Sequence, residues 1–73
     1  MKIEYKIISS ITGGINETYT DIDEVKKRYK YINSHKKELS KNSMIYIYKN
    51  IYNEEGKIKN SKTLAIIDLR KEQ

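Results

Sequence analysis

The sequence predicts a small α+β domain, with one helix packed on one face of an antiparallel sheet of three to four strands. Along residues 2–11 and 43–52, the side chains at odd and even positions differ in type, a period of two that is typical of strands. Between them, apolar residues recur at helical spacing. A chain of 73 residues buries too little surface for a second core. We therefore expect residues 1–73 to form a single domain, ordered strand, strand, helix, strand, strand, with a frayed tail at 70–73.

A glycine pair joins the first two expected strands. Ile3, Tyr5 and Ile7 share one face of the first strand, and charged residues occupy the other face. Residues 12–14, Thr-Gly-Gly, favour a hairpin turn because glycine adopts positive φ without strain. Residues 15–19 alternate again, so they predict a short returning strand.

The expected helix is capped at its start by Thr20 or Asp21. Asp21, with Glu24 three residues later, matches a capping box. Asn33 and Ser34 weaken the helix, which therefore ends there or continues to about residue 39. Its apolar stripe comprises Ile22, Val25, Tyr29, Ile32 and, seven residues further on, Leu39.

The second half of the chain predicts a hairpin. Ile45, Ile47 and Ile51 fall on one face of the strand over residues 43–52. Residues 53–56 form a turn that ends on a glycine, and residues 63–69 form the final strand. We expect the core between helix and sheet to contain Ile3, Ile7, Val25, Tyr29, Ile32, Ile45, Ile47 and Ile67.

Several kinds of chemistry are not expected. Without cysteine, the chain has no disulfide, thiolate metal site or cysteine nucleophile. His35 has no nucleophile at a recognisable spacing, and residues 13–14 lack the rest of a phosphate-binding loop. Helix capping explains the acids Asp21, Asp23 and Glu24 better than a metal does. We therefore expect no enzyme activity, no cofactor, no metal ion and no small-molecule substrate.

The same sequence predicts no association with membranes. No apolar run approaches the roughly 18 residues of a membrane-spanning helix. The first five residues alternate charged with apolar side chains, unlike a signal peptide. We expect a cytoplasmic location.

The candidate partner-binding residues lie on the strand over residues 43–52. One helix covers only one face of a sheet, so the other face is solvated or partnered. The face opposite the isoleucines presents Met44, Tyr46, Tyr48 and Tyr52. Tyrosine is enriched at interfaces because it combines a large contact area with a polar tip. Three interpretations stay open: contact with a protein or a second copy, cross-strand packing without a partner, and base stacking.

Basic charge offers an alternative site. The net charge is +5, and Lys26, Lys27, Lys30, Lys37 and Lys41 share the outer face of the expected helix. Such a face either follows a nucleic-acid backbone or is simply solvated. The 13 lysines stand against 2 arginines, the bias of an AT-rich genome, so the charge need not report a ligand.

The leading hypothesis is a small non-catalytic protein that acts through protein–protein contact. It suits an accessory protein of a phage or mobile element that inhibits or modulates a host enzyme or defence complex. That origin rests on chain length and codon bias alone. The alternative is a small nucleic-acid-binding regulator that uses the lysine-rich helix face.

Overall fold

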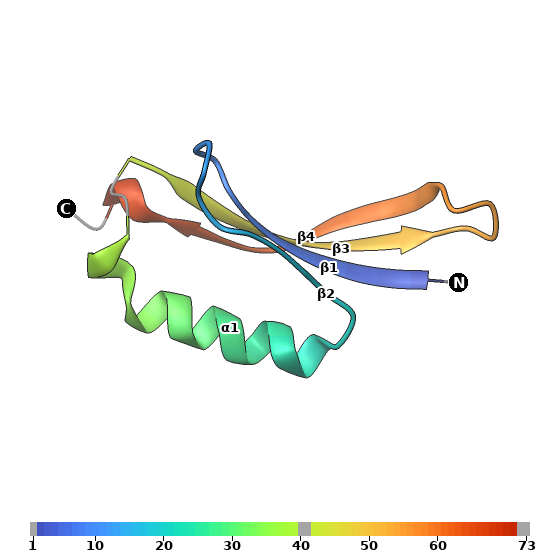
Figure 1. Ribbon diagram of the computed structural model, residues 1–73, viewed down its shortest axis with the longest axis horizontal. Helices are drawn as coiled ribbons and strands as arrows, with labels where there is room; N and C mark the ends of the chain where they lie inside the picture. The colour runs from blue at the N-terminus through green and yellow to red at the C-terminus, as the bar shows by residue number, and fades with distance from the viewer. Residues whose placement is uncertain (1, 40–41, 72–73) are drawn as a thin grey trace.

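The computed structural model describes residues 2–39 and 42–71, which form a four-stranded antiparallel sheet with one helix against it (Figure 1). The sheet order is β2-β1-β3-β4. The elements are β1 (Lys2–Ser9), β2 (Asn16–Tyr19), α1 (Ile22–Ser34), β3 (Met44–Tyr52) and β4 (Ile58–Asp68), with short 3-10 helices η1 (Lys36–Glu38) and η2 (Leu69–Lys71). The α+β class expected from the sequence is confirmed.

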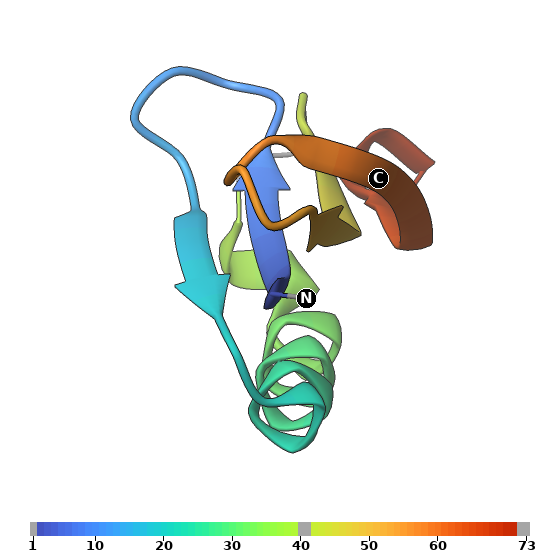
Figure 2. The same ribbon diagram turned by 90° about the vertical axis from the view of Figure 1, so that its right-hand side faces the viewer.

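The helix covers only part of one sheet face. Seen along the sheet, α1 lies beneath β1, and β4 stands at the opposite edge from β2 (Figure 2). The hairpin of β3 and β4 also extends well past the end of the helix (Figure 1). Two parts of the helix-side face are therefore less covered: the strip under β4 and the far end of the hairpin.

The core lies where α1 meets the central strands. Its buried residues are Tyr5, Ile7, Val25, Ile32, Ile45, Ile47, Ile67 and Leu69. Two of the expected core residues differ: Ile3 is 39% exposed, and Tyr29 is only partly buried. Ile3 pairs with Ile51 near the end of the hairpin that α1 does not reach, whereas Tyr5 lies within its reach.

The helix begins and ends close to the expected residues. The Asp21 carboxylate accepts a hydrogen bond from the Asp23 backbone N–H at 2.9 Å, which satisfies one of the free donors of the first turn. The helix ends at Ser34, and the N–H of His35 bonds back to the carbonyls of Tyr31 and Ile32. The chain then tightens into η1 instead of continuing as α-helix.

The turn between β1 and β2 depends on its glycines. Gly13 has φ of +81°, a conformation that strains other residues. A Cβ on Gly14 would lie 2.7 Å from the Ser9 Cβ, so this position has no room for a side chain. The glycine pair that predicted this hairpin is therefore required by both backbone conformation and close packing.

The last strand begins earlier than expected, at Ile58 instead of residue 63. The turn before it is fixed by Asn53, whose side-chain oxygen accepts the N–H groups of Glu55 and Lys57, and by Gly56 at φ of +80°. Residues 58–62 are exposed on both faces, so their sequence lacks the alternation that identifies a half-buried strand. At the other end, residues 69–71 form η2, and residues 72–73 of the expected tail lie outside the described residues.

Candidate functional site

The strand register forms rows of neighbouring side chains across the open face, the sheet face away from α1. Tyr46 of β3 lies between Ile8 of β1 and Ile66 of β4. In the adjacent row, Tyr48 is opposite Lys6. Ile66 is 52% exposed, although it neighbours an aromatic residue in the sheet. The open face therefore carries an apolar surface that extends over three strands.

Contacts within β3 order this surface. The rings of Tyr46 and Tyr48 are stacked, with centroids 6.0 Å apart and planes 8° from parallel. The Tyr46 hydroxyl donates to the Met44 sulfur at 3.4 Å. All three side chains are half-buried, so each keeps surface available for contact. We call Ile8, Met44, Tyr46, Tyr48 and Ile66 the open-face patch.

Tyr52, the fourth expected partner-binding residue, lies apart from this patch. Asn50 comes between it and Tyr48 on the same face, is buried, and accepts a hydrogen bond from Ser61 at 2.7 Å. The Tyr52 hydroxyl donates to Glu4 at 3.1 Å, and this bond raises the pKa of Tyr52. The tyrosine row therefore has a polar interruption. The register between strands cannot be derived from the amino-acid sequence alone, so sequence analysis missed Ile8 and Ile66 as neighbours of Tyr46.

Of the five expected lysines the structure describes four, and the three on α1 divide between its two sides. Lys26 and Lys30 line a groove toward β4, whereas Lys27 lines a separate hollow on the β2 side with Tyr19 and Arg28. Lys37 is exposed on η1, and Lys41 lies outside the described residues. The helix thus does not gather these lysines into one compact site.

The groove between α1 and β4 is lined mainly by apolar side chains. It has a volume of about 380 Å³ and is lined by Ile22, Val25, Lys26, Tyr29, Lys30, Ile47, Leu64 and Ala65. Leu64 sits beside a register irregularity in the β3–β4 pairing and is 39% exposed. We call this hollow the α1–β4 groove.

A polar cluster joins β2 to the helix. Glu17 accepts two hydrogen bonds from the Arg28 guanidinium, at 2.8 Å each, and a third from the Tyr19 hydroxyl at 2.6 Å. The Arg28 contact lowers the pKa of Glu17, and the Glu17 carboxylate raises the pKa of Tyr19. Because the carboxylate is occupied by neighbours in the chain, this cluster serves to hold β2 against α1.

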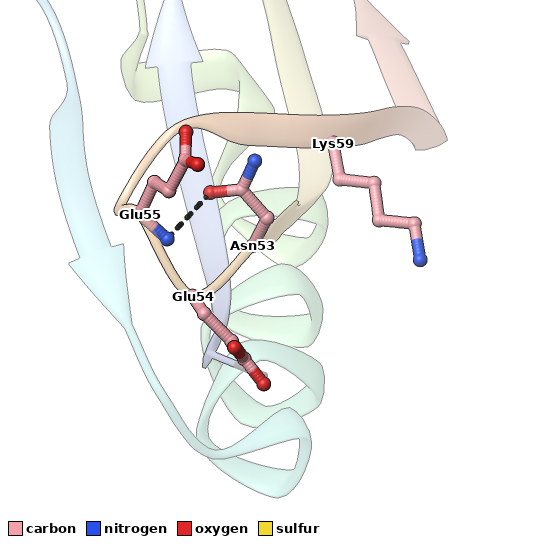
Figure 3. Close-up of a pocket in the computed structure, with 4 residues that line it drawn as sticks. All are labelled: Asn53, Glu54, Glu55 and Lys59. Carbon is pink, nitrogen blue, oxygen red and sulfur yellow. Dashed lines mark hydrogen bonds between the residues drawn. The ribbon is translucent and has the colours of Figure 1, made fainter.

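His35 lies at the end of α1, and Glu54 and Glu55 lie in the turn between β3 and β4. His35 Nδ1 lies 2.7 Å from the Tyr31 carbonyl, and the two rings stack with centroids 4.0 Å apart. At the hairpin tip, the carboxylates of Glu54 and Glu55 point away from each other (Figure 3). Over residues 2–39 and 42–71, no group of three or more His, Asp or Glu side chains is placed to hold a metal ion.

Comparison of the chain with models of protein families, with curated proteins and with solved structures finds no match. None of the helices within residues 2–39 and 42–71 has the length and hydrophobicity that a membrane span requires. Function must therefore be inferred from the surfaces themselves.

Proposed function

We propose that this chain is a non-catalytic protein that binds another protein through the open-face patch. The observation that carries the proposal is the row in which Tyr46 lies between Ile8 and the half-exposed Ile66, on a face without a helix. Contiguous apolar surface on a sheet is a common feature of protein interfaces. A host enzyme or defence complex is the kind of target that we propose.

The order within the patch favours binding further. Tyrosine loses little rotamer entropy at an interface, and stacking already restricts the rings of Tyr46 and Tyr48. Side chains that are fixed before binding reduce the entropic cost of association. The Tyr46 hydroxyl donates to Met44 and keeps its acceptor lone pairs for a partner.

The test is a capture experiment with a matched control. The immobilised chain is exposed to a nuclease-treated lysate of a low-GC bacterium, and captured proteins are identified by mass spectrometry. Tyr46→Ser with Tyr48→Ser should abolish capture, whereas Tyr31→Ser, which removes a tyrosine that is 53% exposed on α1, should not. A partner that binds all three forms equally contradicts the proposal. So does a partner that is captured from a parallel untreated lysate but not after nuclease treatment.

The alternative is a nucleic-acid-binding regulator. Phosphate binding needs several cations that follow one backbone. Lys26 and Lys30 lie on one side of α1 and Lys27 on the other, which gives this alternative less support. It predicts that the affinity for nucleic acid falls steeply as the salt concentration rises.

A further inference from the structure

We infer that the free edge of β4, together with the α1–β4 groove, binds an extended acidic segment of a partner protein. The segment adds a strand beside β4, places apolar side chains over the groove and places a carboxylate beside Lys62. This surface lies at the sheet edge and on the helix side. It is therefore separate from the open-face patch and independent of the function proposed above.

The edge of β4 supplies the backbone groups for such pairing. Within the described sheet β4 lies at the edge beside β3, so backbone N–H and C=O groups point outward at alternate positions in each stretch between the register irregularities at Ile47/Tyr48 and Ile51/Tyr52. A long free edge is a template for another strand, and extended peptides bind proteins by joining such edges. The opposite edge is less suitable, because β2 has only 4 residues.

The groove supplies apolar contact next to this edge. Leu64 and Ala65 of β4 line it together with Ile22 of α1. The helix lies beneath β1, so the helix-side face near β4 is left partly uncovered (Figure 2). Alternate side chains of a strand lie about 7 Å apart on one face. An apolar side chain of an added strand would thus lie over the groove beside Ala65, and the next on the same face would lie at the position of Ile67, whose own side chain is buried.

The lysines determine the charge of the segment. Lys49 and Lys62 are direct cross-strand partners on the helix side of the sheet, where Tyr5 opposite Lys49 joins the core. Like charges at opposed positions are destabilising, and neither lysine has an ion pair within the described residues. Lys26 and Lys30 add positive charge from the helix, and no residue that lines the groove is acidic. A carboxylate placed here relieves the repulsion.

Other occupants fit this surface less well. A second copy of the chain would bring two molecules of net charge +5 together, with Lys59 and Lys62 on each paired strand. A nucleic acid would neutralise the lysines but leave the apolar lining of the groove without apolar contact. An acidic, strand-forming protein segment satisfies the backbone edge, the groove and the charge together.

The probe is an acetylated synthetic peptide with the sequence Glu-Thr-Val-Thr-Val-Thr-Glu, in which glutamate and valine share one face of the strand and threonine occupies the other. One control peptide carries lysine in place of each glutamate. A second carries proline at the central threonine, which removes a donor from the β-ladder. Binding is followed by NMR of the ¹⁵N-labelled chain. We expect the glutamate peptide alone to bind, to shift the amide signals of Leu64 and Ala65, and to slow hydrogen exchange along β4.

Charge reversal provides the decisive variant. The double variant Lys49→Glu with Lys62→Glu should bind the glutamate peptide with an affinity lower by about tenfold or more. It should also gain affinity for the lysine peptide. An unfolded variant cannot show this reversal. Lys57→Glu with Lys59→Glu makes the same change of charge at the hairpin tip and should retain the original preference. Tyr46→Ser with Tyr48→Ser should also retain it, whatever its effect on capture by the open-face patch.

Four results would overturn the inference. The first is equal binding of the glutamate and lysine peptides. The second is a set of NMR shifts confined to the open-face patch. The third is displacement of the peptide by a single-stranded oligonucleotide at equal concentration. The fourth is a dimer in analytical ultracentrifugation that protects the amides of β4 without any peptide, which would make a second copy the occupant.

Discussion

Arg28 of α1 donates two hydrogen bonds to the Glu17 carboxylate of β2, from Nε and Nη2, each at 2.8 Å. This pair ties the helix to the shortest strand of the sheet, and it is about one-third exposed on both sides. β2 has 4 residues and pairs only with β1, so its ladder holds it weakly. The ion pair therefore fixes the edge at which the chain passes from sheet to helix.

Arg28→Met should destabilise the fold by about 1 kcal/mol, because it keeps the alkyl chain but removes both charge-assisted hydrogen bonds. The adjacent Lys27→Met, at an exposed position, should change stability by less than about 0.5 kcal/mol. Urea denaturation of both variants checks this. Equal effects of the two substitutions would mean that the ion pair contributes nothing measurable.

The same pair predicts a dependence of stability on pH. Arg28 holds the pKa of Glu17 below its usual value in the folded chain. The resulting stabilisation is fully present above the unfolded pKa of about 4.3 and is lost as pH falls through the lower folded value. The difference in unfolding free energy between the native chain and Glu17→Gln should therefore shrink in that range. A difference that stays constant down to about pH 2 contradicts this assignment.

The sequence predicted those elements whose side chains alternate between a buried and an exposed environment. β1, α1 and β3 were located because the core imposes a period on each of them. The start of β4 was missed because residues 58–62 are exposed on both faces. Hydrophobic patterning reports burial, so a strand held only by its ladder gives no such signal.

Sequence analysis predicted the residues of the open-face patch that lie on β3 but not their neighbours on β1 and β4. The sequence predicts that Tyr46 and Tyr48 share one face of the sheet, because residues two apart on a strand point to the same side. The neighbours Ile8 and Ile66 depend on the register between strands, which turn geometry and bulges set. The α1–β4 groove depends on which strands the helix covers. Composition and periodicity do not determine that position.

Ile47 tests the packing of the core. It is buried between sheet and helix, so Ile47→Ala should cost about 2–5 kcal/mol through lost contacts and a cavity. Ile3→Ala removes the same atoms at a position that is 39% exposed and should cost less than about 1 kcal/mol. Chemical denaturation of both variants gives the comparison. Similar costs at the two positions would contradict the placement of the helix over the sheet.

Lys62→Glu should stabilise the isolated domain by about 0.2–1 kcal/mol, because it converts an opposed like-charge pair with Lys49 into an opposite-charge pair. Lys59→Glu makes the same change of net charge on the same strand and serves as the control. The gain should decline in high salt, since the pair is near the surface. A loss of stability specific to Lys62→Glu would show that this lysine has a favourable partner within the fold.

Duplex DNA provides the measurement for the alternative function. With the helix lysines divided between two sides, we expect weak binding without sequence preference, lost near about 150 mM salt. Fluorescence anisotropy over a salt series gives both the affinity and its slope. A submicromolar dissociation constant at about 150 mM salt would favour the nucleic-acid regulator over the protein-binding function.

Substitution of the stacked pair Tyr46 and Tyr48 distinguishes a role in folding from a role in binding. Both rings are half-buried, so Tyr46→Ser and Tyr48→Ser should each cost about 1 kcal/mol, with a coupling of about 0.5–1.5 kcal/mol from the stack. The double variant should remain folded, because the buried isoleucines lie on the other face of β3. A double-mutant cycle in urea measures the coupling, and NMR of the double variant checks that the fold persists. An unfolded double variant would make the pair part of the structural core. A folded variant that has lost its partner would place the pair at the interface.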